Sequence, residues 1–283
     1  TRQGAGSSLT KATRVKDSGI SLKYSNTNRD MKFGLLYSKK KSGSDPDVYN
    51  STGTTRLGST DVKLIDIFFK KSFSDISLGV EVPIISGDIG NAFGQNTNYK
   101  TKAVIFQGRY KASDSWTFGV DAGKVDGDDG TQGTYGAMYL NPNFQIANLM
   151  FRYNLRAVSN TNNNVYESYI NNTLYAKLHA KYSTERWDWT FAGIYATADQ
   201  VALGSGDVAY NHDTNQRFTS TVAQSDDLGF ELDTGFKYRW NSEITVGGTL
   251  GWLFTGDYYA YTNGTQNEVK NSYALQLNTM IRF

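Results

Sequence analysis

The sequence alternates between apolar and polar residues over much of its length, and the last eleven residues show this pattern clearly. In an extended strand, successive side chains point to opposite faces. One face of residues 273–283 is therefore mostly apolar, with aromatic residues near both ends: Tyr273, Leu275, Leu277, Thr279, Ile281 and Phe283. The other face is polar or small, so the segment is predicted to be a strand with one oily side and one wet side.

The same two-sided pattern recurs along the chain and is plainest at residues 226–240. One predicted face carries Leu228, Phe230, Leu232, Phe236, Tyr238 and Trp240. The other carries Asp227, Glu231, Asp233, Lys237 and Arg239. A basic side chain facing lipid at the bilayer midplane costs roughly 2–4 kcal/mol. Separation of charged from apolar side chains in strand after strand favours a membrane β-barrel over a soluble sandwich.

The composition permits such a barrel. No run among the 283 residues approaches the eighteen apolar residues that a transmembrane helix needs, whereas a barrel strand needs apolar residues only at alternate positions. Only 3 Pro interrupt the strands, and 19 Tyr suit the aromatic girdles of a membrane interface. The net charge of +2 is too balanced to indicate nucleic-acid binding, and the absence of Cys excludes disulfides and thiolate sites.

A two-sided terminal strand that ends in Phe283 resembles the closing strand of bacterial outer-membrane β-barrel proteins, including porins. The resemblance implies a location in the outer membrane of a Gram-negative bacterium, with lipid and lipopolysaccharide as surroundings. It also implies that the barrel-assembly machinery reads the terminal strand. The candidate assembly signal is Tyr273, Leu275, Leu277, Ile281 and Phe283.

The expected fold is all-β, an antiparallel transmembrane β-barrel of 14 strands. Strands are predicted near 18–27, 30–40, 61–72, 74–85, 100–111, 115–125, 133–140, 144–157, 166–183, 186–197, 226–240, 243–256 and 273–283. Leu64 and Phe68 break the alternation of their strand, which a bulge would explain. Barrels of this kind have an even strand number. Either residues 3–15 add a weak first strand, or the chain is part of a larger barrel that lacks upstream strands.

Two domains are predicted. Residues 1–17 form a basic, polar segment that is either this weak first strand or a plug, and residues 18–283 form the barrel.

The charged faces are predicted to line a pore. The proposed pore-lining residues are Arg109, Arg152, Arg156, Lys177, His179, Lys181, Asp188, Glu231, Asp233, Lys237 and Arg239. Both signs of charge occur, and the group Arg152, Arg156, Lys177 and Lys181 indicates a mild preference for anions. The alternative is that the charges pair across a plugged interior.

Signals for chemistry are weak. His212, in a polar loop with Asp213, Ser205 and Asp207, offers a possible rim hydrolase, although such neighbours arise easily by chance. Residues 126–130 only superficially match a calcium loop and are better explained as a hairpin tip. No catalytic residue, metal site or cofactor is therefore predicted.

The function expected first is a non-enzymatic, porin-like channel through which small hydrophilic solutes diffuse. The alternative is a surface scaffold, adhesin or assembly anchor that displays the loops 41–60 and 198–225. Homo-oligomers are compatible with either function.

Overall fold

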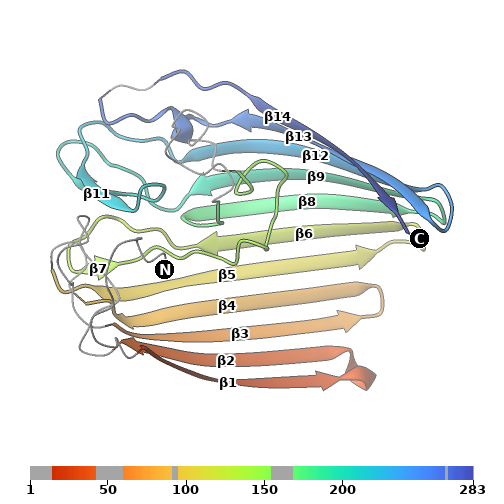
Figure 1. The fold of residues 1–283 in the computed structure, drawn as a ribbon, viewed down its shortest axis with the longest axis horizontal. Helices are drawn as coiled ribbons and strands as arrows, with labels where there is room; N and C mark the ends of the chain where they lie inside the picture. Colours follow the sequence, from red (N-terminus) through yellow and green to blue (C-terminus); the bar gives the residue numbers. More distant parts are fainter. Residues whose placement is uncertain (1–14, 43–59, 91–94, 154–167, 265–266, 283) are drawn as a thin grey trace.

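Eleven long antiparallel strands form one curved wall in the computed structural model (Figure 1). The structure describes residues 15–42, 60–90, 95–153, 168–264 and 267–282. The wall strands, in spatial order, are β1 (Val15–Asn26), β2 (Met31–Ser42), β3 (Asp61–Phe73), β4 (Ile76–Asp88), β5 (Asn98–Lys111), β6 (Trp116–Val125), β8 (Thr173–Ser183), β9 (Trp187–Ala198), β12 (Asp227–Arg239), β13 (Ile244–Thr255) and β14 (Ser272–Ile281). Each has 10 to 14 residues, a length that suits a tilted span of a bilayer.

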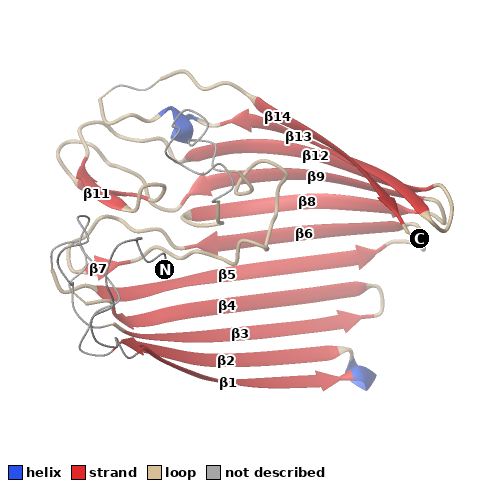
Figure 2. Ribbon diagram, in the orientation of Figure 1, coloured by secondary structure: helices blue, strands red, loops and turns tan. Residues whose placement is uncertain are grey.

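The two ends of the wall differ in their connections (Figure 2). At the turn end, strands join through short links such as residues 74–75, 112–115 and 184–186. At the loop end, residues 126–172 join β6 to β8, and residues 199–226 join β9 to β12. Short periplasmic turns and long extracellular loops are typical of outer-membrane barrels.

Apolar side chains cover the outer face of the wall, defined as the face that bears Phe230 and Leu232. These two side chains are 39% and 48% exposed, whereas Glu231 between them is 0% exposed on the inner face. The predicted separation of oily and ionic faces is therefore confirmed on β12. Within the described ranges, no helix has the length and apolarity needed to cross a membrane.

Two details of the predicted faces are corrected. Leu228 does not share the outer face, because the register between β12 and β9 shifts between Asp227 and Gly229 and turns Leu228 into the buried core. Gly229 adopts φ +108, which favours glycine at this bulge. In β3, by contrast, the predicted bulge is absent. The register is continuous and Leu64 and Phe68 simply lie on the inner face.

The predicted strands at 133–140 and 144–157 are wrong as wall strands. The described part of the first contains only β7 (Thr134–Tyr135), which pairs in parallel with β5. Residues 144–153 follow an irregular path along the inner face and are named the inner segment here. Ile146, Ala147, Leu149 and Met150 are all buried, so burial does not alternate along it as it would in a two-sided strand. Residues 154–157 lie outside the described residues.

The loop end holds further structure. A small hairpin, β10 (Val208–Asn211) and β11 (Gln216–Thr219), lies within the loop predicted at 198–225. β8 begins at Thr173 rather than near residue 166. Of the short 3-10 helices in the described residues, η4 (Asp257–Ala260) follows β13 at this end, whereas η1 (Thr27–Arg29) lies in the link between β1 and β2 at the turn end (Figure 2).

The all-β, antiparallel fold class is confirmed, with fourteen strands in the described residues. β1 and β14 form the two edges of the wall, and no strand register joins them within the described ranges. Val15–Asp17 belong to β1, whereas residues 1–14 of the predicted N-terminal segment lie outside the described residues.

Candidate functional site

The inner segment is fixed to the wall by one carboxylate. The backbone N–H groups of Asn148, Leu149 and Met150 donate to the Glu231 carboxylate at 2.8, 2.7 and 2.7 Å. The N–H of Asn148 also donates to Asp233 Oδ2 at 3.0 Å. Successive backbone N–H groups that converge on an anion form a nest, and hydrogen bonds to a charged acceptor are stronger than neutral ones.

Lys177 holds the same segment from the neighbouring part of the wall. Its Nζ donates to the carbonyl oxygen of Ile146 at 2.6 Å. The strand β8 places Lys177 on the inner face, where its register partner on β6 is Asp121. The wall therefore binds the N–H groups of the inner segment with acids and one of its carbonyls with a base.

Small residues leave room for this contact. A Cβ at Gly251 would lie 2.9 Å from Cβ of Asn148 and 3.2 Å from Oε1 of Glu231. The inner segment therefore approaches the β13 backbone closely at Gly251.

A cavity of about 430 Å³ lies between the inner segment and the wall. Basic and acidic side chains of the inner face line it: Arg109, Lys177, Lys181, Asp121 and Asp233, together with His179. Three basic side chains therefore face two acidic ones, beside a histidine. Gln107, Thr117, Gln145, Thr190 and Thr249 add polar atoms around them.

Arg109, Asp121 and His179 form a cluster on one wall of this cavity. Arg109 Nη1 donates to Asp121 Oδ1 at 2.6 Å, and His179 Nε2 lies 3.5 Å from Asp121 Oδ2. Gly119 makes space for the ring, because a Cβ there would lie 2.2 Å from His179 Nε2. His179 Nε2 and Asp233 Oδ1 are buried and have no hydrogen-bond partner among the described residues. Water or a polar solute in the cavity would satisfy them.

The other predicted pore-lining residues fall into three groups. Asp188 and Arg239 form an ion pair on the inner face of β9 and β12, and the exposed Lys237 of β12 lies opposite Asp188 in the register. Arg152 is not on a wall strand; it lies in the inner segment, where its Nη2 donates to Gln276 Oε1 at 3.4 Å. Arg156 lies outside the described residues.

The predicted basic patch is therefore rearranged. Lys177 and Lys181 share the inner face of β8, but Arg152 does not sit on the adjacent strand. The role of residues 148–150 as the partner of Glu231 was not predicted from the sequence. The only available signal was the pair Glu231 and Asp233, two acids on the inward side of one strand that require donors when buried.

His212 and the loop 126–130, for which a rim hydrolase and a calcium loop were considered, are in contact at the loop end. The N–H of Asp128 donates to His212 Nε2 at 2.9 Å, and burial lowers the pKa of His212 to about 4. The carboxylate of Asp128 accepts the N–H groups of Gly130 and Gly136, at 2.8 and 2.7 Å. Both residues thus have structural partners. No group of three or more potential metal ligands occurs in the described part of the chain.

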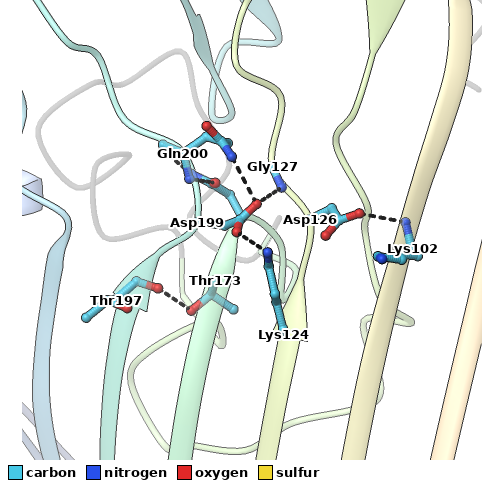
Figure 3. A network of polar contacts seen from close by, with 9 residues as sticks. Lys102, Lys124, Asp126, Gly127, Thr173, Thr197, Asp199 and Gln200 are labelled. Carbon is cyan, nitrogen blue, oxygen red and sulfur yellow. Dashed lines mark hydrogen bonds and ion pairs between the residues drawn. The ribbon is translucent and has the colours of Figure 1, made fainter.

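A second polar network joins the same loop to the wall (Figure 3). Asp199 accepts a hydrogen bond from the N–H of Gly127 at 3.0 Å and pairs with Lys124 Nζ at 2.9 Å. Asp126 accepts the backbone N–H of Lys102 at 3.0 Å. Asp126 and Asp199 therefore fasten the loop 126–130 to the loop ends of β5, β6 and β9.

The candidate assembly signal lies on β14. Tyr273, Leu275 and Leu277 are 74%, 66% and 69% exposed on the outer face, and Ile281 is 54% exposed. Phe283 lies outside the described residues.

The fold and the distribution of side chains are those typical of outer-membrane β-barrel proteins: an apolar outer face, a charged inner face, and short links at one end of the wall with long loops at the other.

An iron transporter, an alcaligin receptor and a porin are among the solved structures that resemble this chain. The iron transporter FrpB of Neisseria meningitidis matches with a TM-score of 0.42 and 8% identity, over 84% of this chain and 35% of FrpB. The alcaligin receptor FauA of Bordetella pertussis matches with a TM-score of 0.47 and 11% identity, over 95% of this chain and 42% of FauA. The porin NanC matches with a TM-score of 0.35 and 9% identity, over 96% of each chain.

This chain spans about a third of the length of FrpB. No family model and no curated protein sequence matches it. The likeness is one of fold.

Proposed function

We propose that the protein is a channel through which small hydrophilic solutes diffuse, narrowed by the inner segment. The observation that carries the proposal is the nest of Asn148–Met150 amides on Glu231, which holds chain across the inner face. A fixed segment of this kind would set the size limit, and the cavity of about 430 Å³ beside it would set the charge preference.

The charges around the cavity support a mild preference for anions. Arg109 is paired with Asp121, and Lys177 is held by Ile146, whereas Lys181 is exposed and lines the cavity. Lys181 is thus the base best placed to meet a passing ion. A field from unneutralised positive charge attracts anions and repels cations.

The test is current through the purified protein in a planar lipid bilayer with a salt gradient. We expect discrete conductance steps and a reversal potential whose sign shows that anions cross more readily than cations. Lys181→Glu should move the reversal potential toward cations. Lys71→Glu is the matched control, because Lys71 lies on the outer face over the Phe73 ring and should leave it unchanged.

Absence of current from folded protein would refute the channel. An unchanged reversal potential in Lys181→Glu, with normal current, would refute the role of the cavity in selectivity.

A further inference from the structure

Lysines gather on the outer face of the wall near its loop end. The strand registers place Lys39 of β2 opposite Lys63 of β3, Lys63 opposite Ser86 of β4, and Ser86 opposite Lys100 of β5. These positions share the outer face with Ile65 and Ile84, which are 39% and 37% exposed. Three lysines therefore lie in one row across four strands, on the side of the wall that faces lipid.

Four more outward lysines extend this row into a band. Lys16 of β1 lies opposite Lys41 of β2, Lys102 lies opposite Ile84, and Lys124 of β6 lies opposite Val104 of β5. The lysine band is defined as Lys16, Lys39, Lys41, Lys63, Lys100, Lys102 and Lys124. It stops beyond β6, because the partners that continue the register are Leu174 of β8 and then Thr197 of β9.

Acids neutralise only part of the band. Asp61 pairs with both Lys39 and Lys41, with N–O distances of 3.0 and 3.6 Å, and Asp199 pairs with Lys124. Within the described residues, Lys16, Lys63, Lys100 and Lys102 have no ion pair. Like charges directly opposite each other on neighbouring strands are destabilising, and Lys63 lies opposite Lys39 without an ion pair of its own in the described residues, so an external anion beside Lys63 would be stabilising.

The turn end of the same face is different. Aromatic side chains dominate there, including Tyr24, Phe73, Tyr110, Trp116 and Trp187, which are 37% to 52% exposed. Aromatic rings are typical of a membrane interface with ordinary lipids. The lysines of the outer face are therefore concentrated at the loop edge of the apolar surface, where long lysine side chains can reach the headgroups while their stems stay in the apolar region.

We propose that the lysine band binds the phosphate groups of lipid A, the phosphorylated lipid of the membrane leaflet on the loop side. The observations that point to it are the position of the band at the edge of the lipid-facing surface, its surplus of positive charge and its place beside the long loops. Each lysine close to an anionic membrane surface strengthens attachment measurably. The inference is independent of whether the protein conducts solutes.

The experiment compares binding of two lipids to the folded, detergent-solubilised protein by native mass spectrometry. The lipids are lipid A with both phosphates and the same lipid after enzymatic removal of the phosphates. We expect the phosphorylated lipid to bind at least about tenfold more tightly, and the preference to weaken at high salt.

The variant Lys63→Gln/Lys100→Gln should lose most of this preference. Both residues lie in the row, and neither has an ion pair within the described residues, so the change should not disturb the wall. Lys71→Gln is the control, because it removes a lysine from the outer face of the same strand, β3, at the turn end. Circular dichroism and heat-dependent gel mobility show that each variant is folded.

Three results would overturn the proposal. Equal binding of the two lipids would mean that acyl chains alone are recognised. If Lys71→Gln lost the preference for phosphorylated lipid A to the same extent, the total charge of the protein and not the lysine band would determine binding. Full retention in the double variant would exclude this site.

Discussion

The backbone N–H of Met150 donates to Oε2 of Glu231 at 2.7 Å, although the two residues are 81 positions apart in the chain. Met150 and Glu231 are both 0% exposed. The bond therefore joins the inner segment to the wall inside a closed, low-dielectric environment, where hydrogen bonds to a carboxylate contribute strongly.

Glu231→Gln should release the inner segment. The amide presents an NH2 group where the carboxylate accepted three N–H groups, and an unsatisfied buried donor costs about 1–3 kcal/mol. Hydrogen–deuterium exchange at the amides of Asn148–Met150 should accelerate about 5- to 150-fold. Glu243→Gln, in the exposed turn between β12 and β13, is the control and should leave these amides unchanged. Equal exchange in both variants would mean that Glu231 does not hold the segment.

Gly123→Val should destabilise the wall. A Cβ at Gly123 would lie 2.5 Å from Cε1 of Tyr175, whose ring is buried in the core at 2% exposure. Overpacking a buried site costs roughly 1–3 kcal/mol, which should appear as a lower urea midpoint for unfolding from lipid vesicles. Gly79→Val is the matched strand control, since the nearest atoms to its Cβ lie at 3.9 Å. A larger loss in the control would contradict this explanation.

The loop-end contact of His212 should weaken in acid. Burial lowers its folded pKa to about 4, below the ordinary value of 6.5, so the unfolded loop takes up the proton first as the pH falls. The contribution of His212 is therefore complete above about pH 6.5 and declines between pH 6.5 and 4, by ~3 kcal/mol in all. Protonated Nε2 can no longer accept the N–H of Asp128.

His212→Gln is the comparison for this effect, because a Gln side chain keeps an acceptor but does not titrate in this range. Burial raises the pKa of Asp128, so that carboxyl contributes stability in its protonated form and loses it as the pH rises. The unmodified protein and His212→Gln share this opposite dependence of stability on pH. The difference between their pH profiles therefore reports the contribution of His212. The measurement is the pH dependence of exchange protection at the Asp128 amide. Identical profiles would show that His212 does not control the contact.

Leu232→Arg should destabilise the inserted protein by roughly 2–4 kcal/mol if the side chain lies near the midplane of the bilayer. Leu232 is 48% exposed on the outer face, where an arginine would face hydrocarbon. Asn278→Arg, on the inner face of β14, should be tolerated, because Asn278 is exposed on the side opposite to Leu277. Equilibrium unfolding from vesicles measures both, and equal costs would contradict the assignment of faces.

The wall was largely predictable because a strand in a membrane has to sort its side chains every second residue. The local alternation predicts one face for Phe230 and Leu232 and the opposite face for Glu231 and Asp233, and the structure places all four side chains as predicted. The departure at Leu228 follows from a one-residue bulge, which reverses the face of a side chain without a distinct mark in the sequence.

The sequence alone determined the class of fold, because the alternation of apolar and polar residues is visible within each strand without knowledge of its neighbours. Only the tertiary structure decided that residues 144–153 leave the wall and bind across the inner face. Their amides are satisfied by Glu231, which is more than 80 residues away, and such a long-range partner outweighs the strand pattern that the segment shows by itself. The lysine band has the same origin: single lysines scattered through five strands become one charged surface only when the registers place them side by side.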